Sequence, residues 1–131
     1  MAIAPADLSP DHLAFLAERH LATLTTLRPD GRPHVVPVGF SFDPAEHLVR
    51  IITFGHSAKV ANLHTTPGGP AVVCQMDGGR WLSLEGRAVV TDDPARVAVA
   101  VAAYTERYRP PTERTNRVAI ELTVDRVLGR V

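Results

Sequence analysis

The chain has 131 residues, with fourteen acidic side chains against fourteen basic ones and a formal net charge of zero. This length predicts one domain, spanning residues 1–131, and the balanced charge without a basic stripe argues against a nucleic-acid partner. No apolar run is long enough to cross a bilayer, and the N-terminus lacks the charged and apolar regions of a secretion signal. We therefore expect a cytoplasmic protein with no membrane partner.

The first predicted elements are a helix and a β-hairpin. The helix begins after Ser9, a favourable N-cap, and runs to about His20, with Pro10 at its first position. Strand-like runs at 21–27 and 33–42 flank a Pro-Asp-Gly turn, which is typical of a hairpin.

The second strand of this hairpin has two different faces. Pro37 and Gly39 share one face, where proline removes a ladder hydrogen bond and glycine permits a close approach. This face fits an edge strand with a bulge or a strand whose backbone lies along a flat ligand, and the residues leave both open. The other face is apolar and is predicted to join the core: Val36, Val38, Phe40 and Phe42.

The rest of the chain adds four strands and two helices, which makes six strands and about three helices in all. Many short antiparallel strands joined by tight turns favour an α+β, mainly β fold built on a small barrel. The single cysteine, Cys74, lies in an apolar strand and is expected to be reduced. The predicted strands are 47–54, 71–76, 81–91 and 116–131, and the predicted helices are 57–65 and 92–109.

The segment RIITFGHSAKVANL, residues 50–63, holds the only lysine, Lys59. Gly55 permits a sharp exit from the strand, and Ser57 is a plausible N-cap. Unpartnered N–H groups at a helix N-terminus, with a hydroxyl and an ammonium beside them, are typical of an anion site. An ordinary cap with a solvated lysine is the alternative interpretation.

Self-sufficient catalytic groups are not evident. The six histidines show no metal-ligand spacing, so no metal is expected, and no nucleophile or phosphate-loop motif occurs. Trp81, the only tryptophan, follows a Gly-Gly turn and either packs at an interface or stacks on a ring. This pattern favours an anionic organic cofactor that contains a ring system.

Three segments in this order, 32–40, 50–63 and 77–90, resemble the pyridoxamine 5′-phosphate oxidase-like split β-barrels. Within them the chain is most similar to actinobacterial reductases that use the deazaflavin coenzyme F420, of the biliverdin reductase type. The resemblance implies a six-stranded antiparallel split β-barrel with about three flanking helices. It also implies a homodimer with two cofactor sites at the subunit interface.

The resemblance further implies which residues bind F420. The ring would lie along residues 34–37 and beside the backbone of 52–55, and the phosphate would lie at the start of the following helix. The implied cofactor-binding residues are His34, Val35, Val36, Pro37, Ile52, Thr53, Phe54, Gly55, His56, Ser57, Lys59, Asn62 and Trp81.

Two departures from the family bear on the reaction. Ala58 stands where the oxidases carry an arginine, which argues against tightly bound flavin mononucleotide (FMN), and the C-terminus lacks the tryptophan of true pyridoxamine-phosphate oxidases. The resemblance therefore implies an enzyme that transfers hydride from reduced F420 to a conjugated acceptor, with biliverdin, a linear tetrapyrrole, as the first choice. No catalytic residue is assigned, and the candidates for the acceptor's carboxylates are Arg80, Arg87, Arg109 and Arg117.

Three alternatives remain open from the sequence. The first is an FMN-dependent oxidoreductase of the same fold. The second is a protein that holds a flavin, a deazaflavin or haem without turnover. The third is a barrel that only scaffolds a partner.

Overall fold

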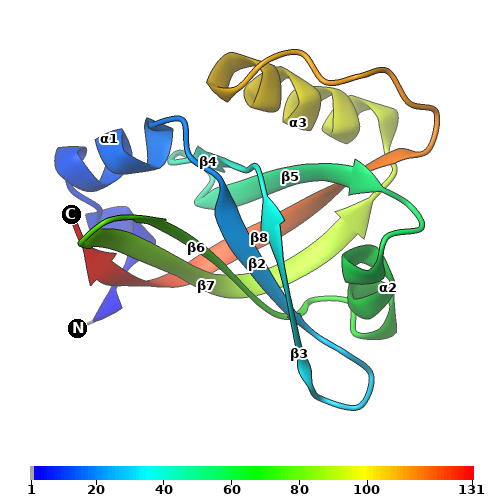
Figure 1. Cartoon of the computed structure of the whole chain (residues 1–131), viewed down its shortest axis with the longest axis horizontal. Coiled ribbons are helices and arrows are strands. Elements are labelled where there is room, and N and C mark those ends of the chain that lie inside the picture. Colours follow the sequence, from blue (N-terminus) through cyan, green and yellow to red (C-terminus); the bar gives the residue numbers. More distant parts are fainter. Residues whose placement is uncertain (1) are drawn as a thin grey trace.

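The computed structural model describes residues 2–131 (Figure 1). Within this range one antiparallel sheet of eight strands is accompanied by three α-helices and one short 3-10 helix. No helix in these residues is both long enough and apolar enough to span a bilayer. The elements in chain order are β1 (Ala2–Ile3), η1 (Pro5–Asp7), α1 (Pro10–Ala17), β2 (Ala22–Leu27), β3 (Pro33–Val38), β4 (Ser41–Asp43), β5 (Leu48–Phe54), α2 (Ala58–Thr65), β6 (Gly69–Asp77), β7 (Arg80–Thr91), α3 (Pro94–Arg107) and β8 (Arg117–Arg130).

The strand order is β3-β2-β6-β7-β8-β5-β4, with β1 paired to β8. The two edge strands, β3 and β4, are consecutive in the chain and are joined only by Gly39 and Phe40. The sheet therefore curls until its edges meet, and α3 lies across β4 and β5 (Figure 1).

The predicted class, a mainly β α+β fold with about three helices, is confirmed, whereas the predicted count of six strands was wrong. One additional strand is the two-residue β1. The other arises because the predicted strand 33–42 is split at Gly39 and Phe40, where the Phe40 N–H donates to Tyr108 Oη at 3.2 Å instead of to a neighbouring strand.

The predicted apolar face of this split strand is confirmed. Val38 and Phe40 are buried in the core, and Val36 and Phe42 pack against it. The first helix is shorter than predicted, because the backbone at Glu18 is already extended and leads into β2.

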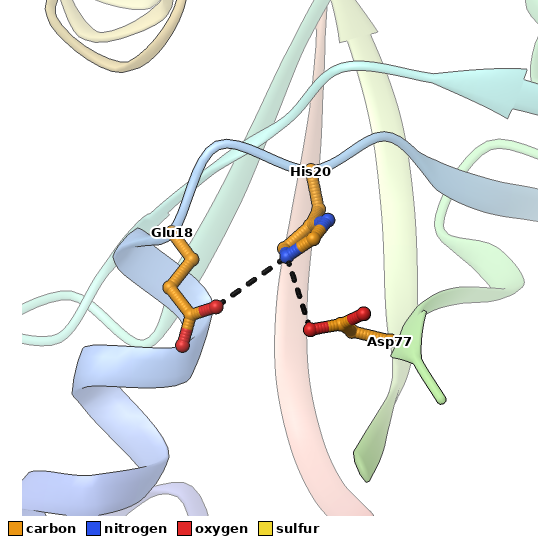
Figure 2. A group of neighbouring side chains, drawn as sticks. All are labelled: Glu18, His20 and Asp77. Atoms are coloured by element: carbon orange, nitrogen blue, oxygen red, sulfur yellow. Dashed lines mark ion pairs between the residues drawn. The ribbon is translucent and has the colours of Figure 1, made fainter. Parts of the chain in front are cut away.

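An ion-pair cluster joins the end of α1 to the β6–β7 hairpin. His20 Nε2 lies 3.4 Å from Glu18 Oε1 and 3.6 Å from Asp77 Oδ2 (Figure 2). Arg80 donates to both Glu18 carboxylate oxygens, at 2.7 and 3.0 Å, and also to Asp77, and it holds the pKa of the Glu18 carboxyl below its usual range. Because these side chains are partly exposed, the cluster orients the two segments more than it stabilises the fold.

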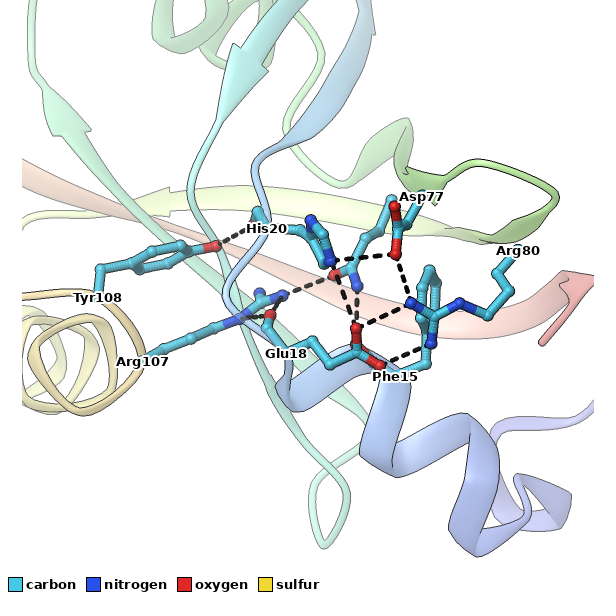
Figure 3. Close-up of polar contacts among 8 residues, drawn as sticks. Phe15, Glu18, His20, Asp77, Arg80, Arg107 and Tyr108 are labelled. Atoms are coloured by element: carbon cyan, nitrogen blue, oxygen red, sulfur yellow. Dashed lines mark hydrogen bonds and ion pairs between the residues drawn. The ribbon is translucent and has the colours of Figure 1, made fainter.

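Arg107, in the last turn of α3, anchors that helix to three other segments (Figure 3). Its Nε and Nη2 donate to the Glu18 carbonyl at 3.1 and 2.7 Å. Nη2 also donates to Gln75 Oε1 at 2.6 Å, and Nη1 donates to the Phe40 carbonyl. The next residue, Tyr108, donates from Oη to the His20 carbonyl at 2.7 Å. The C-terminal end of α3 is thereby fixed to the α1–β2 connection, the β3–β4 junction and β6.

The Arg107 guanidinium has no carboxylate partner within residues 2–131. Burial lowers its pKa, and the ring of Phe40, 4.4 Å from the guanidinium carbon, covers one face of the cation. Charge-assisted hydrogen bonds to oxygen acceptors offset part of the cost of desolvation. Arg107 therefore fixes α3 to the barrel.

We expect Arg107→Met to lower the free energy of unfolding by about 3 kcal/mol. Gln75 Oε1, on a fully buried side chain, loses its donor, and the Glu18 and Phe40 carbonyls each lose one of their donors. Urea denaturation monitored by circular dichroism measures this loss. Arg109→Met is the matched control, since Arg109 is exposed and makes no hydrogen bond or ion pair in the described chain. Equal destabilisation by both substitutions would contradict the role given to Arg107.

Candidate functional site

A cavity of about 600 Å³ opens where the end of β5, the β3–β4 junction, α3 and the segment 109–117 meet. Tyr104 of α3 forms part of its wall. The cavity gathers five of the thirteen residues that the sequence predicts to bind the cofactor. These five are Pro37, Ile52, Thr53, Phe54 and Lys59.

Four basic side chains line this cavity: Lys59, Arg109, Arg114 and Arg117. None of its lining residues carries a carboxylate, and none of the four cations forms an ion pair anywhere in residues 2–131. Burial lowers the pKa of the half-buried Lys59 ammonium. Cations held together without counter-charges are suited to a ligand with several negative charges.

The end of β5 places Lys59 by a tight turn into α2. The Gly55 N–H donates to the Asn116 carbonyl at 3.0 Å, and the Ser57 N–H donates to the Phe54 carbonyl at 3.1 Å. Ser57 occupies the predicted N-cap, but its hydroxyl makes no capping bond and lies 3.5 Å from Thr53 Oγ1. The hydroxyl accepts this long hydrogen bond from Thr53, so its own proton can be donated to a ligand beside the first turn of α2.

The segment 109–117 closes the cavity opposite β5. The guanidinium carbon of Arg114 lies 4.0 Å from the centre of the Phe54 ring, a cation–π contact. Arg117 pairs with Phe54 across β5 and β8, and its side chain donates to the Thr112 carbonyl. Sequence reasoning missed Arg114, because this segment has no periodicity that would place it on any element.

Gly39 allows a close approach, as its residue type suggests, but the groups that approach it within this chain are aromatic rings of α3. A Cβ atom at Gly39 would lie 3.1 Å from both Tyr104 and Tyr108. The two rings pack with centroids 4.9 Å apart. Because Gly39 has no side chain, the two tyrosine rings can pack against the backbone there, and Tyr104 can line the cavity.

Three other predicted residues point into the barrel instead of the cavity. Asn62 of α2 is buried and donates to Thr26 Oγ1 at 3.1 Å. His34 Nδ1 is buried and has no hydrogen-bond partner in residues 2–131. Val36 packs against the core.

The remaining predicted residues lie outside the cavity lining. Gly55, His56 and Ser57 form the turn beside it, where His56 stacks on Phe54 with ring centroids 6.1 Å apart. Val35 and Trp81 are 56% and 37% exposed on the outer face of the sheet, away from the core. Within a single chain, Trp81 and Lys59 therefore do not line the same cavity.

The four arginines named from the sequence divide evenly. Arg109 and Arg117 line the cavity. Arg80 is held by Glu18 and Asp77, and Arg87 donates to the Gly68 carbonyl at 3.4 Å. Because Arg80 already pairs with both carboxylates beside His20, that cluster is an ion-pair network and offers no free ligand set for a metal.

Two solved structures share this fold. The conserved hypothetical protein Rv2991 from Mycobacterium tuberculosis matches with a TM-score of 0.79 and 23% identity, over 94% of this chain and 84% of that one. An F420 reductase matches with a TM-score of 0.75 and 22% identity, over 92% of this chain and 98% of that one.

Another protein is more similar in sequence to this chain than these two structures are. F420H(2)-dependent biliverdin reductase from Mycobacterium tuberculosis (strain CDC 1551 / Oshkosh) is 56% identical over 122 residues, which cover 93% of this chain and 88% of that protein. Residues 8–130 match the family model described as pyridoxamine 5′-phosphate oxidase. Since that match spans nearly the whole chain, the chain belongs to the pyridoxamine 5′-phosphate oxidase family.

Proposed function

We propose that this chain is an F420H2-dependent reductase that delivers hydride to a conjugated acceptor, with biliverdin as the first acceptor to test. The observation that carries the proposal is the cavity with four unpaired cations and no lining carboxylate. F420 is a polyanion with a flat ring, so its charges match this set of donors. The 56% identical relative, whose name states the same activity, supports the assignment.

The residues of the cavity divide the binding of this cofactor between them. Lys59 suits the phosphate, together with the Ser57 hydroxyl, which makes no capping hydrogen bond to α2. Pro37 and the end of β5, Ile52–Phe54, suit a flat ring, because they offer apolar surface and a strand edge that β4 leaves unpaired beyond Arg50. Arg109 suits a remaining negative charge of the cofactor. Ala58 supports F420 over FMN, since the arginine of the related oxidases is absent there.

When bound, reduced F420 supplies a hydride and releases a ring proton, so that the acceptor gains two electrons with the hydride and takes its proton from solvent. The chain's own part is to hold the ring against β5, to keep the charged end in place and to exclude water. No side chain is assigned as a general acid.

We further propose that a second copy of this chain covers the outer face of the sheet. Strand register places apolar side chains of β2, β3, β6 and β7 on that face. Among them Leu27, Val35, Met76 and Trp81 are 43%, 56%, 60% and 37% exposed. Exposed apolar patches of neighbouring side chains are typical of interfaces. A homodimer would bury Val35 and Trp81, two predicted site residues that do not line the cavity.

The wild-type protein is expected to oxidise reduced F420 when biliverdin is added, measured by the rise of oxidised F420 absorbance under anaerobic conditions. The same assay with FMN in place of F420 serves as the cofactor control. If reduced F420 stays unoxidised with biliverdin and with quinones and enones, the proposed reaction is wrong.

Lys59→Met is expected to weaken F420 binding at least tenfold, or about 1.5–3 kcal/mol, because a half-buried ammonium that pairs with the phosphate is lost. Fluorescence titration of the cofactor measures the dissociation constant. Arg28→Met is the control, because it removes one positive charge at an exposed turn outside the cavity. It should leave the F420 dissociation constant unchanged. Unchanged affinity in Lys59→Met would remove Lys59 from the site.

The affinity for F420 is also expected to depend on alkaline pH. Burial lowers the pKa of Lys59 in the free protein, and a bound anion favours the charged form, so binding is full below that pKa and weakens as pH rises through it. In Lys59→Arg the guanidinium stays charged and the alkaline loss should disappear. Titrations across alkaline pH compare the two proteins, and identical profiles would contradict this account.

Met76→Glu is expected to convert the dimer into monomer, because it places a charge in the proposed interface at a position that is 60% exposed in the single chain. Analytical ultracentrifugation measures the mass. Val99→Glu introduces the same charge at a position that is 50% exposed on α3 and should leave the dimer intact. A wild-type protein that sediments as a monomer would contradict the proposed homodimer.

A further inference from the structure

A second and larger cavity, of about 1220 Å³, lies between α3 and the segment 110–117. One face of α3 forms its floor, with Val97, Val101 and Thr105 four residues apart and Pro94 at the start. Neither Val97 nor Val101 lines the smaller cavity described above, here called the cationic cavity. The larger cavity thus has an apolar floor of its own.

The two cavities differ in charge. The larger cavity is lined by two carboxylates, Asp92 and Glu113, and by two guanidiniums, Arg114 and Arg117. The cationic cavity has four cations and, within the described chain, no carboxylate. A polyanion therefore favours the cationic cavity, and the larger one suits a ligand that is mostly apolar and carries few charges.

The two cavities also share a wall. Arg114 and Arg117 line both, together with Pro110, Pro111 and Thr112. Ligands in the two cavities would therefore be neighbours along this segment, as two reactants must be. The guanidinium of Arg114 is held on the Phe54 ring, so a cation stands fixed at the boundary.

We propose that the larger cavity binds the hydride acceptor, an extended conjugated molecule with carboxylates on its edge, and that Arg114 and Arg117 bind those carboxylates. This inference rests on the proposed function, since it assigns the cationic cavity to F420. A linear tetrapyrrole has the matching chemistry: a long apolar conjugated chain, N–H groups that can donate to Asp92 or Glu113, and two carboxylates. The cavity, at about 1220 Å³, exceeds the usual range of about 300–1,000 Å³ for small-molecule sites, which suits a ligand as long as a tetrapyrrole.

The test is direct binding of biliverdin to the F420-loaded protein, followed by its absorbance change. The double substitution Val97→Phe with Val101→Phe fills the floor of the larger cavity and is expected to raise the biliverdin dissociation constant about tenfold or more. The F420 dissociation constant should stay within about twofold, because neither valine lines the cationic cavity. Val99→Phe, on the exposed side of the same helix, is the matched control and should change neither constant.

A second variant tests the carboxylate contact without filling the cavity. Arg114 is exposed, so Arg114→Gln should fold like the wild type. The wild type is expected to bind biliverdin about tenfold more tightly than its dimethyl ester, and Arg114→Gln should reduce that preference. This readout isolates the ligand's charge from any change in the shape of the cavity.

Three results would overturn the inference. One is unchanged biliverdin binding in the double phenylalanine variant with a folded protein. Another is loss of F420 binding in that variant, which would assign the larger cavity to the cofactor. The last is an undiminished preference for the free acid in Arg114→Gln. Biliverdin that binds as expected but leaves reduced F420 unoxidised would instead contradict the proposed function.

Discussion

The position of α3, and of the segment that follows it, depends on one partly buried cation. Arg107 joins the end of α3 to carbonyls of Glu18 and Phe40 and to the side chain of Gln75, which belong to three separate parts of the barrel. The chain that follows it becomes the segment 109–117, which lines both cavities. A guanidinium suits this task because its planar fork donates in several directions at once and stays charged when buried. The barrel thereby fixes a segment that has no regular structure.

Electrostatics separates the structural arginines from those suited to ligands. Arg50 and Arg80 pair with carboxylates and have their charges compensated within the chain. Arg109 and Arg114 have no such partner in residues 2–131 and stand at the cavities instead. Since a paired arginine has little left to offer an anion, Arg50 and Arg80 are poor candidates for ligand contacts, whereas the charges of Arg109 and Arg114 are not compensated by a carboxylate in the described residues.

Much of the fold and part of the site could be predicted from local chemistry. The N-cap at Ser57, the turn at Gly55 and the apolar face of residues 33–42 follow from residue types and spacing, and resemblance to a family supplied the barrel. Arg114 could not be predicted, because it lies in irregular chain and its contact with Phe54 arises only when α3 is docked. Trp81 was expected near the cofactor, yet β-strand alternation directs it to the outer face, where it lies beside Met76 and does not line the cavity.

The segment 109–117 has a consequence for how such enzymes diversify. It joins α3 to β8, carries no β-ladder before Arg117 and contributes nothing to the buried core. Its replacement would therefore alter the acceptor's surroundings at little cost to folding, while the end of β5 and Lys59 would continue to hold the same cofactor. A single barrel could then support a series of reductases that differ mainly in nine consecutive residues, and exchange of this segment between relatives offers a route to new acceptor preferences.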